Sequence, residues 1–240
     1  MPIAALKHPI RLFWDIDGTL LRTHGAAAIP FAKAVSEYAR KVIEIDRKKL
    51  SGHTDYEIVK ILLNSVGIEA SFRQIKKILR AYTNELPTSL EGSSTGVIGN
   101  IKEILTRLKI TQNFELAIGT GNFYTGAKIK LNYVGLLDFF EDKYIFCSTE
   151  NNWSRDLVIM AAKGSLAKNQ LGIVIGDSPK DIISAKNAGL AVIAVSTGNH
   201  TSAELLDFNP NYLLDKDWTY EDLLYKIHEI VKYQASVVKL

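Results

Sequence analysis

The sequence predicts an α/β fold in which a doubly wound parallel sheet forms the core and a block of helices is inserted near the N-terminal end. Three observations lead to this prediction. From residue 101 onward, short apolar runs alternate with segments in which apolar residues recur every three or four positions, as they do in helices. One further apolar run lies at 10–14. The residues between that run and residue 101 show only the helical spacing. Strands that alternate with helices form parallel sheets covered on both faces.

The first predicted strand is the apolar run at 10–14, which ends at two aspartates and a glycine. From about residue 25 to residue 86, apolar side chains recur at spacings of three and four, which predicts three or four helices. Thr54 or Asp55 is placed to cap the middle helix and Ser71 the next. The stretch 87–99 is rich in Ser, Thr and Gly and is predicted to be a loop.

The remainder of the chain alternates regularly between strands and helices. We predict strands at 114–118, 144–147, 172–175, 191–195 and 212–214. We predict helices at 101–108, 123–134, 156–167, 179–188 and 220–233. The chain therefore divides into an α/β core, residues 1–21 and 96–240, and a helical cap, residues 22–95.

Composition narrows the classes of protein that fit. The chain has 240 residues, 47% of them hydrophobic, which suits one α/β domain with an insertion. A single cysteine, Cys147, excludes an intrachain disulfide and a four-cysteine zinc site, and its apolar neighbours predict burial. No stretch resembles a signal peptide or a membrane span, so we expect a cytoplasmic protein with no membrane partner. A net charge of +3 is too small to predict nucleic-acid binding.

Two aspartates directly follow the first predicted strand. Asp15 and Asp17 are two residues apart, so on an extended chain they face the same side, and Gly18 lets the chain turn. The carboxyl ends of parallel strands form the ligand-binding edge of a sheet. Crowded carboxylates repel each other unless a cation or a shared proton relieves them. The pattern therefore indicates a site for a hard cation such as Mg²⁺, with an aspartate-rich capping turn as the alternative.

A second predicted strand, at 114–118, also ends in polar residues. Thr120 and Asn122 follow it with Gly121 between them, just before a predicted helix. A hydroxyl and the backbone N–H groups of a helix N-terminus suit a phosphate. An ordinary N-cap loop has the same appearance, so this segment does not predict a site by itself.

A third predicted strand, at 172–175, is followed by Asp177 and, four residues later, by Asp181. Either aspartate could bind a cation at the same edge of the sheet. Asp181 could instead stabilise the helix through its dipole, because it lies in the first helical turn.

Together, these three strand ends resemble the haloacid dehalogenase-like (HAD) hydrolase superfamily. Residues 15–19 look like its first motif, Thr120 like the hydroxyl of its second, and residues 176–181 like its fourth. The helical insertion is similar to the family's C1-type cap. The resemblance as a whole implies a Rossmann-like core. Residues 50–55, Leu-Ser-Gly-His-Thr-Asp, resemble the phosphoglycolate phosphatase-like branch, which often has Gly-Arg-Thr-Asp there.

The family's third motif, a lysine or arginine that neutralises the phosphate, is less clear here. The usual Lys-Pro is absent, and Arg155 stands near the expected place, 22 residues before Asp177. Lys163 and Lys143 are the alternatives, and a surface role for Arg155 is a further one.

The resemblance implies a magnesium-dependent phosphatase that hydrolyses a small-molecule phosphate monoester. Asp15 would attack phosphorus to form an aspartyl-phosphate, and Asp17 would act as general acid and then as general base. Magnesium would be bound by the Asp15 carboxylate, the Asp17 carbonyl and Asp177. The phosphate would be bound by Thr120, the Gly121 backbone and Arg155. Further candidates for the site are Gly18, Asn122, Asp181 and His53.

Other functions remain open at this stage. A phosphomutase of the same fold would keep Asp17 and move the phosphate between sugar positions. A non-catalytic phosphate-binding relative is favoured only by the missing Lys-Pro. Dehalogenases and phosphonate hydrolases of this fold lack the second aspartate, so Asp17 argues against them. Phosphoglycolate, sugar phosphates, nucleotides and pyrophosphate are all possible substrates, and the oligomeric state is open.

Overall fold

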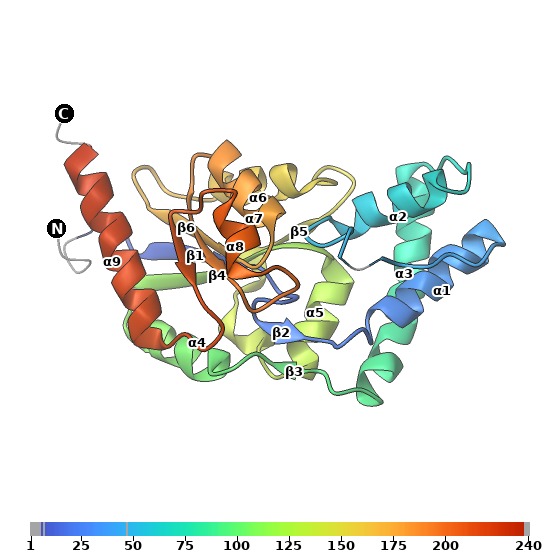
Figure 1. Ribbon diagram of the computed structural model, residues 1–240, viewed down its shortest axis with the longest axis horizontal. Coiled ribbons are helices and arrows are strands. Elements are labelled where there is room, and N and C mark those ends of the chain that lie inside the picture. Colours follow the sequence, from blue (N-terminus) through green and yellow to red (C-terminus); the bar gives the residue numbers. More distant parts are fainter. Residues whose placement is uncertain (1–5, 7, 47, 238–240) are drawn as a thin grey trace.

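The computed structural model describes residues 6, 8–46 and 48–237. A six-stranded sheet, parallel throughout, runs through the core, which confirms the predicted α/β class (Figure 1). The strand order is β5-β4-β1-β6-β7-β8, with the bounds β1 Ile10–Trp14, β4 Phe114–Phe123, β5 Ile145–Ser148, β6 Gly172–Gly176, β7 Ala191–Val195 and β8 Tyr212–Leu214. Because β1 lies between β4 and β6, Asp15 and Asp17 leave the sheet between the other two predicted sites.

Helices cover both faces of the sheet, as a doubly wound fold requires. One face is covered by α4 (Ile101–Ile110), α5 (Tyr124–Tyr133) and α9 (Tyr220–Val237). The other is covered by α6 (Arg155–Gly164), α7 (Pro179–Asn187) and α8 (Ser202–Leu206). Two short 3₁₀ turns, η2 (Leu137–Phe139) and η3 (Asp142–Tyr144), lead into β5.

Side chains of β1 alternate between the two hydrophobic layers. Leu12 and Trp14 pack with the layer of α4, α5 and α9, and Phe13 packs with the layer of α6, α7 and α8. Trp14 also stacks on Trp218, with 6.3 Å between the ring centroids. All five residues of β1 are buried, so this strand anchors both layers and fixes the position of the aspartates that follow it.

The residues between β2 and β3 form a helical lid beside the sheet (Figure 1). Its helices are α1 (Ala28–Ala39), α2 (Asp55–Asn64) and α3 (Phe72–Glu91), and they bury a hydrophobic cluster of their own. The chain enters the lid through β2 (Leu21–Arg22) and returns through β3 (Gly96–Val97), and these two strands pair antiparallel. The division of the chain into a core and a cap at residues 22 and 95 stays a prediction.

Most local expectations agree with the described elements, and one was wrong. Thr54 and Ser71 each close a capping box at the start of α2 and α3. The predicted loop at 87–99 does not begin at Pro87, because α3 continues through this proline to Glu91. Leu86 and Leu90 are fully buried on the same helix face. Burying each contributes about 1.5–3 kcal/mol, which offsets the roughly 3 kcal/mol that an interior proline costs a helix.

Two further observations bear on the sequence analysis. Cys147 is buried on β5, as predicted, and burial raises the pKa of its thiol. Among the helices of the described residues, none combines the length and the apolar character that crossing a membrane would need.

Leu105→Ala tests the importance of the packing between α4 and the sheet. Leu105 is fully buried, so its truncation should lower the free energy of unfolding by about 2–5 kcal/mol. Ile110→Ala on the same helix is the control, because Ile110 is 73% exposed and its truncation should change stability little. Urea unfolding of both variants measures the difference, and equal losses would contradict the packing described for α4.

Candidate active site

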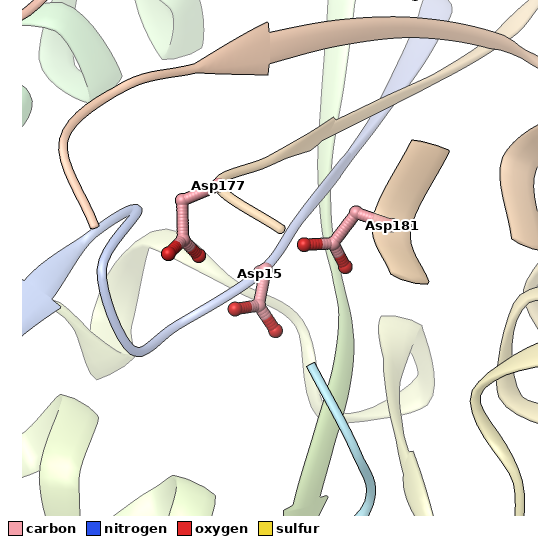
Figure 2. Close-up of side chains that lie close together, drawn as sticks. All are labelled: Asp15, Asp177 and Asp181. Carbon is pink, nitrogen blue, oxygen red and sulfur yellow. The ribbon is translucent and has the colours of Figure 1, made fainter. Parts of the chain in front are cut away.

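Carboxylates from two neighbouring strands and one helix meet at the carboxyl edge of the sheet. Asp15 follows β1, Asp177 follows β6, and Asp181 lies in the first turn of α7. Each offers a carboxylate oxygen, and these oxygens lie within 4.8 Å of one another. Figure 2 shows the three side chains gathered around one point, with Asp181 directed toward the other two. The structure therefore brings together the first and third predicted sites.

Arg155 links two of these carboxylates. Its side chain is buried at the start of α6, and Nη2 donates to Oδ1 of Asp15 at 3.0 Å and to Oδ1 of Asp181. Lys163 is exposed, and Lys143 is exposed and paired with Glu141 at 2.8 Å. Of the three basic residues considered for the third motif, Arg155 alone lies in the site.

Asp181 is fully engaged by the protein. Its Oδ2 accepts hydrogen bonds from the backbone N–H of Ser178 at 3.0 Å and from the Ser178 hydroxyl at 2.7 Å, which closes a capping box. Its Oδ1 accepts from Arg155. Although Asp181 is near the other carboxylates, its oxygens are already committed, so Asp15 and Asp177 are the carboxylates left to hold an ion.

Lys130 is a buried cation in this site that was not among the predicted site residues. Its Nζ donates to Oδ2 of Asp17 and to Oδ1 of Asn122, both at 2.6 Å, and its side chain is only 5% exposed. Lys130 lies on α5 three residues after the buried Ala127 and next to the buried Leu131. A lysine at a position where helical spacing predicts an apolar residue was the signal that could have revealed it.

The polar residues after the regular part of β4 complete this half of the site. The Asn122 amide donates to Asp17 Oδ2 at 2.8 Å and to the Thr120 hydroxyl at 2.9 Å. The Thr120 hydroxyl lies against Asp15 and favours its ionised form. A Cβ at Gly121 would lie 2.7 Å from the carbonyl oxygen of His53, so glycine here lets the lid approach the sheet.

The lid docks onto the core beside these residues. The Thr54 hydroxyl donates to the backbone carbonyl of Trp153. Asp55 Oδ2 accepts from the backbone N–H of Phe123 at 2.7 Å. His53 borders the same cavity as Asp15 and Asp17, so the structure places it beside the predicted site.

A cavity of about 430 Å³ lies between the core and the lid. Its walls include all the predicted site residues except Thr120 and Asp181, which are buried and do not line it. Lys130 and Arg155 also border it, together with several lid residues. The cavity is large enough for a small organic phosphate and lies at the sheet edge where α/β folds bind ligands.

The charges around the cavity do not balance. Five carboxylates and three cations lie in or beside the cavity wall, a net charge of −2 if all are ionised: Asp15, Asp17, Asp55, Asp177 and Asp181 against Arg22, Lys130 and Arg155. Burial raises the pKa of Asp15 to about 7, although the Arg155 guanidinium acts in the opposite direction. Burial and the neighbouring Asp15 raise the pKa of Asp177 well above its usual value.

The carboxylates around the two buried cations, Lys130 and Arg155, favour the charged forms of these side chains. Burial alone would lower the pKa of the Lys130 ammonium, but Asp17, Tyr82 and Asp55 around it raise the pKa above its usual value. Burial likewise works against the Arg155 guanidinium, and Asp181 and Asp15 raise its pKa. Both side chains therefore stay charged at neutral pH.

The carboxylates of Asp15 and Asp177 fit a metal ion. Asp177 is 3% exposed, and its Oδ1 accepts one long hydrogen bond, 3.3 Å, from the Thr19 hydroxyl. A Cβ at Gly18 or Gly198 would collide with the Asp177 carboxylate, so both glycines make room for it. Carboxylate oxygens are the ligands that hard divalent cations prefer, and such a cation would offset the excess negative charge. The Asp17 carboxylate faces Lys130 instead, so only its main-chain carbonyl could take part.

This chain is similar to a hydrolase family and to known or probable phosphatases. The family model described as haloacid dehalogenase-like hydrolase matches residues 12–195. A probable phosphatase, IndB, from Dickeya dadantii (strain 3937) is 26% identical over 96% of this chain and 98% of its own length. A phosphoglycolate phosphatase from Mesorhizobium japonicum is 25% identical over 87% of this chain and 91% of its own.

Among solved structures, a predicted phosphatase from Clostridium acetobutylicum has the same fold. It superposes with a TM-score of 0.70 at 20% sequence identity, over 93% of this chain and 100% of its own.

Lys130→Met tests the buried ion pair with Asp17. Methionine keeps most of the side-chain packing but leaves Asp17 and Asn122 without their donor, so the free energy of unfolding at neutral pH should fall by about 1–3 kcal/mol. Lys128→Met is the matched control, because Lys128 lies on the same helix with an exposed partner, Asp142, and should matter little. Urea unfolding measures both, and a loss no larger than that of the control would refute the ion pair.

The raised pKa of Asp15 predicts a pH dependence of stability when no divalent cation is present. Between its unfolded value of 3.8 and its folded value of about 7, the unfolded chain releases a proton that the folded chain keeps. The free energy of unfolding should therefore fall as pH rises through this window. Unfolding in chelator across the window measures it, and Asp15→Asn should reduce the fall, whereas the exposed Asp138→Asn should not. An unchanged fall in Asp15→Asn would contradict the assignment.

Proposed function

This chain belongs to the haloacid dehalogenase-like hydrolase family, and on that premise we propose that it is a magnesium-dependent phosphatase of small phosphate monoesters. The observation that carries the proposal is the position of Asp15. Its carboxylate borders the cavity, is paired with the buried Arg155, and lies beside the unneutralised Asp177. A nucleophile, a guanidinium and a metal-binding carboxylate within reach of one phosphoryl group are what phosphoryl transfer through a covalent intermediate needs.

In the proposed reaction, Asp15 is the nucleophile. A bond forms between its carboxylate oxygen and phosphorus while the bond from phosphorus to the leaving oxygen breaks, which gives an aspartyl-phosphate. Arg155 favours the ionised form of Asp15 by its charge. Its Nε is buried and has no hydrogen-bond partner among the described residues, which leaves one N–H for a phosphoryl oxygen.

Asp17 is proposed to transfer the protons. Lys130 and Asn122 both donate to its Oδ2, no described residue donates to its Oδ1, and the side chain is 40% exposed. Oδ1 is therefore the atom that would carry a proton at the start of the reaction and give it to the leaving oxygen. It would then take a proton from the water that attacks the aspartyl-phosphate, which releases phosphate and restores Asp15. Lys130 holds the carboxylate in the orientation that this exchange needs.

The remaining groups bind and enclose the phosphate. Mg²⁺, when bound, would supply positive charge that offsets the charge developing on the phosphoryl oxygens. Asp15, Asp177 and the main-chain carbonyl of Asp17 would hold it. The Thr120 hydroxyl and the Gly121 backbone are placed to donate to the same phosphate. The contacts of Thr54 and Asp55 with the core keep the lid closed over the site and exclude bulk water.

Phosphate release from a panel of small esters, with Mg²⁺ or with EDTA, tests the proposal. The folded protein should release phosphate only with Mg²⁺, and Asp15→Asn should lower kcat/KM on the order of a thousandfold or more, because the nucleophile is lost. Asp217→Asn, an exposed aspartate remote from the cavity, is the matched control and should retain activity. Release that survives EDTA or Asp15→Asn would refute the proposed mechanism. Isomerised sugar phosphate without released phosphate would identify a mutase instead.

A further inference from the structure

The cavity has two chemically different halves. The charged side chains of the core, including Asp15, Lys130 and Arg155, line one half. The lid lines the other half with polar groups, His53 and Asp55 among them, and with a set of apolar side chains that come from Ala27, Ala28, Phe31, Ile45, Leu50 and Ile58. A phosphate bound at Asp15 would therefore place its leaving group against an apolar wall.

Part of this wall is not covered by the protein itself. Ile45, Leu50 and Ile58 pack against the hydrophobic cluster of the lid but are only partly buried. The rings of Phe31 and Tyr82, which also line the cavity, pack together with 4.9 Å between their centroids. Burying such exposed apolar surface against a ligand is favourable by about 25 cal/mol per Å².

The lid half offers little to a second anionic group. Arg22 is the only Lys or Arg among the described residues that line it; its side chain is exposed, and one of its N–H groups donates to the carbonyl of Thr197. Burial and the nearby charge of Lys180 lower the pKa of His53, so its imidazole is neutral at neutral pH. Asp55 adds a carboxylate that would repel an anion. A leaving group that carries a carboxylate or another phosphate would lose hydration here and meet only one cation, Arg22, which the carboxylate of Asp55 opposes.

The size of the cavity agrees with a larger leaving group. Its volume of about 430 Å³ lies in the range of pockets that enclose drug-sized ligands. At about 30 Å³ per water molecule, an ester as small as phosphoglycolate would leave much of this volume to water against apolar side chains.

Building on the proposed phosphatase function, we infer that the substrate is a phosphate monoester of an uncharged alcohol with a bulky apolar or aromatic group. The phosphate binds at Asp15, and the apolar group packs against Leu50 and Ile58 of the lid. This substrate class differs from phosphoglycolate, the substrate named for one of the relatives.

Three esters with alkyl leaving groups test the inference: ethyl phosphate, 2-phenylethyl phosphate and phosphoglycolate. Ethyl and 2-phenylethyl alcohols leave with similar ease, so a difference in kcat/KM between their esters reports contacts with the phenyl ring. We expect kcat/KM for 2-phenylethyl phosphate to exceed the values for the other two esters by about tenfold or more.

A pair of variants on α2 locates the contact. Ile58 lines the cavity, whereas Ile61, three residues later, is 41% exposed and does not line it. Ile58→Ala should reduce the preference for 2-phenylethyl over ethyl phosphate severalfold, and Ile61→Ala should leave that preference unchanged. Equal effects of the two variants would overturn the inference.

The possible outcomes separate the inference from the proposal on which it rests. Asp15-dependent hydrolysis that favours phosphoglycolate, or that shows no preference, would overturn the inference and leave the phosphatase function intact. No hydrolysis of any of the three esters, or of 4-nitrophenyl phosphate, by the folded protein with Mg²⁺ would overturn both. A preference for 2-phenylethyl phosphate that Ile58→Ala reduces would support both.

Discussion

Two buried cations connect the separate segments that form the site. Arg155, at the start of α6, links Asp15 after β1 to Asp181 on α7. Lys130, on α5, links Asp17 to Asn122 and faces Asp55 from the lid. A buried charge is tolerated only when it is paired, so each of these residues depends on the others being in place. The ends of the strands, the starts of the helices and the docked lid are therefore mutually dependent.

The backbone is adapted to this crowding. Asp177 fits beside Asp15 because Gly18 and Gly198 have no side chain where its carboxylate lies. Gly121 allows the carbonyl of His53 to approach the end of β4. The excess of carboxylates that results is unfavourable by itself, and the cation of the proposed reaction would offset it.

Sequence reasoning predicted the parts of the fold and the site that depend on local pattern. The alternation of strands and helices gave the doubly wound sheet, and the strand ends pointed to Asp15, Asp17 and Asp177. Lys130 was missed: its place among the apolar positions of α5 was the one local signal, and because a lysine is normally exposed, its contacts with Asp17 and Asn122 depend on where a long side chain reaches in three dimensions. Pro87 was wrongly taken as the start of a loop, because the burial that keeps α3 helical comes from packing, which a local rule does not contain. The roles of the site residues in catalysis stay predictions.

The paired strands β2 and β3 have a consequence for how the protein can vary. The chain leaves the core and returns to it at neighbouring positions, joined by a short antiparallel ladder. A segment whose two ends already lie together can be lengthened, shortened or exchanged with little demand on the structure that carries it. The sheet and its carboxylates can thus be conserved as a fixed chemical unit while the inserted helices diverge. Changes in what the protein recognises are then open to evolution without changes in the reaction itself.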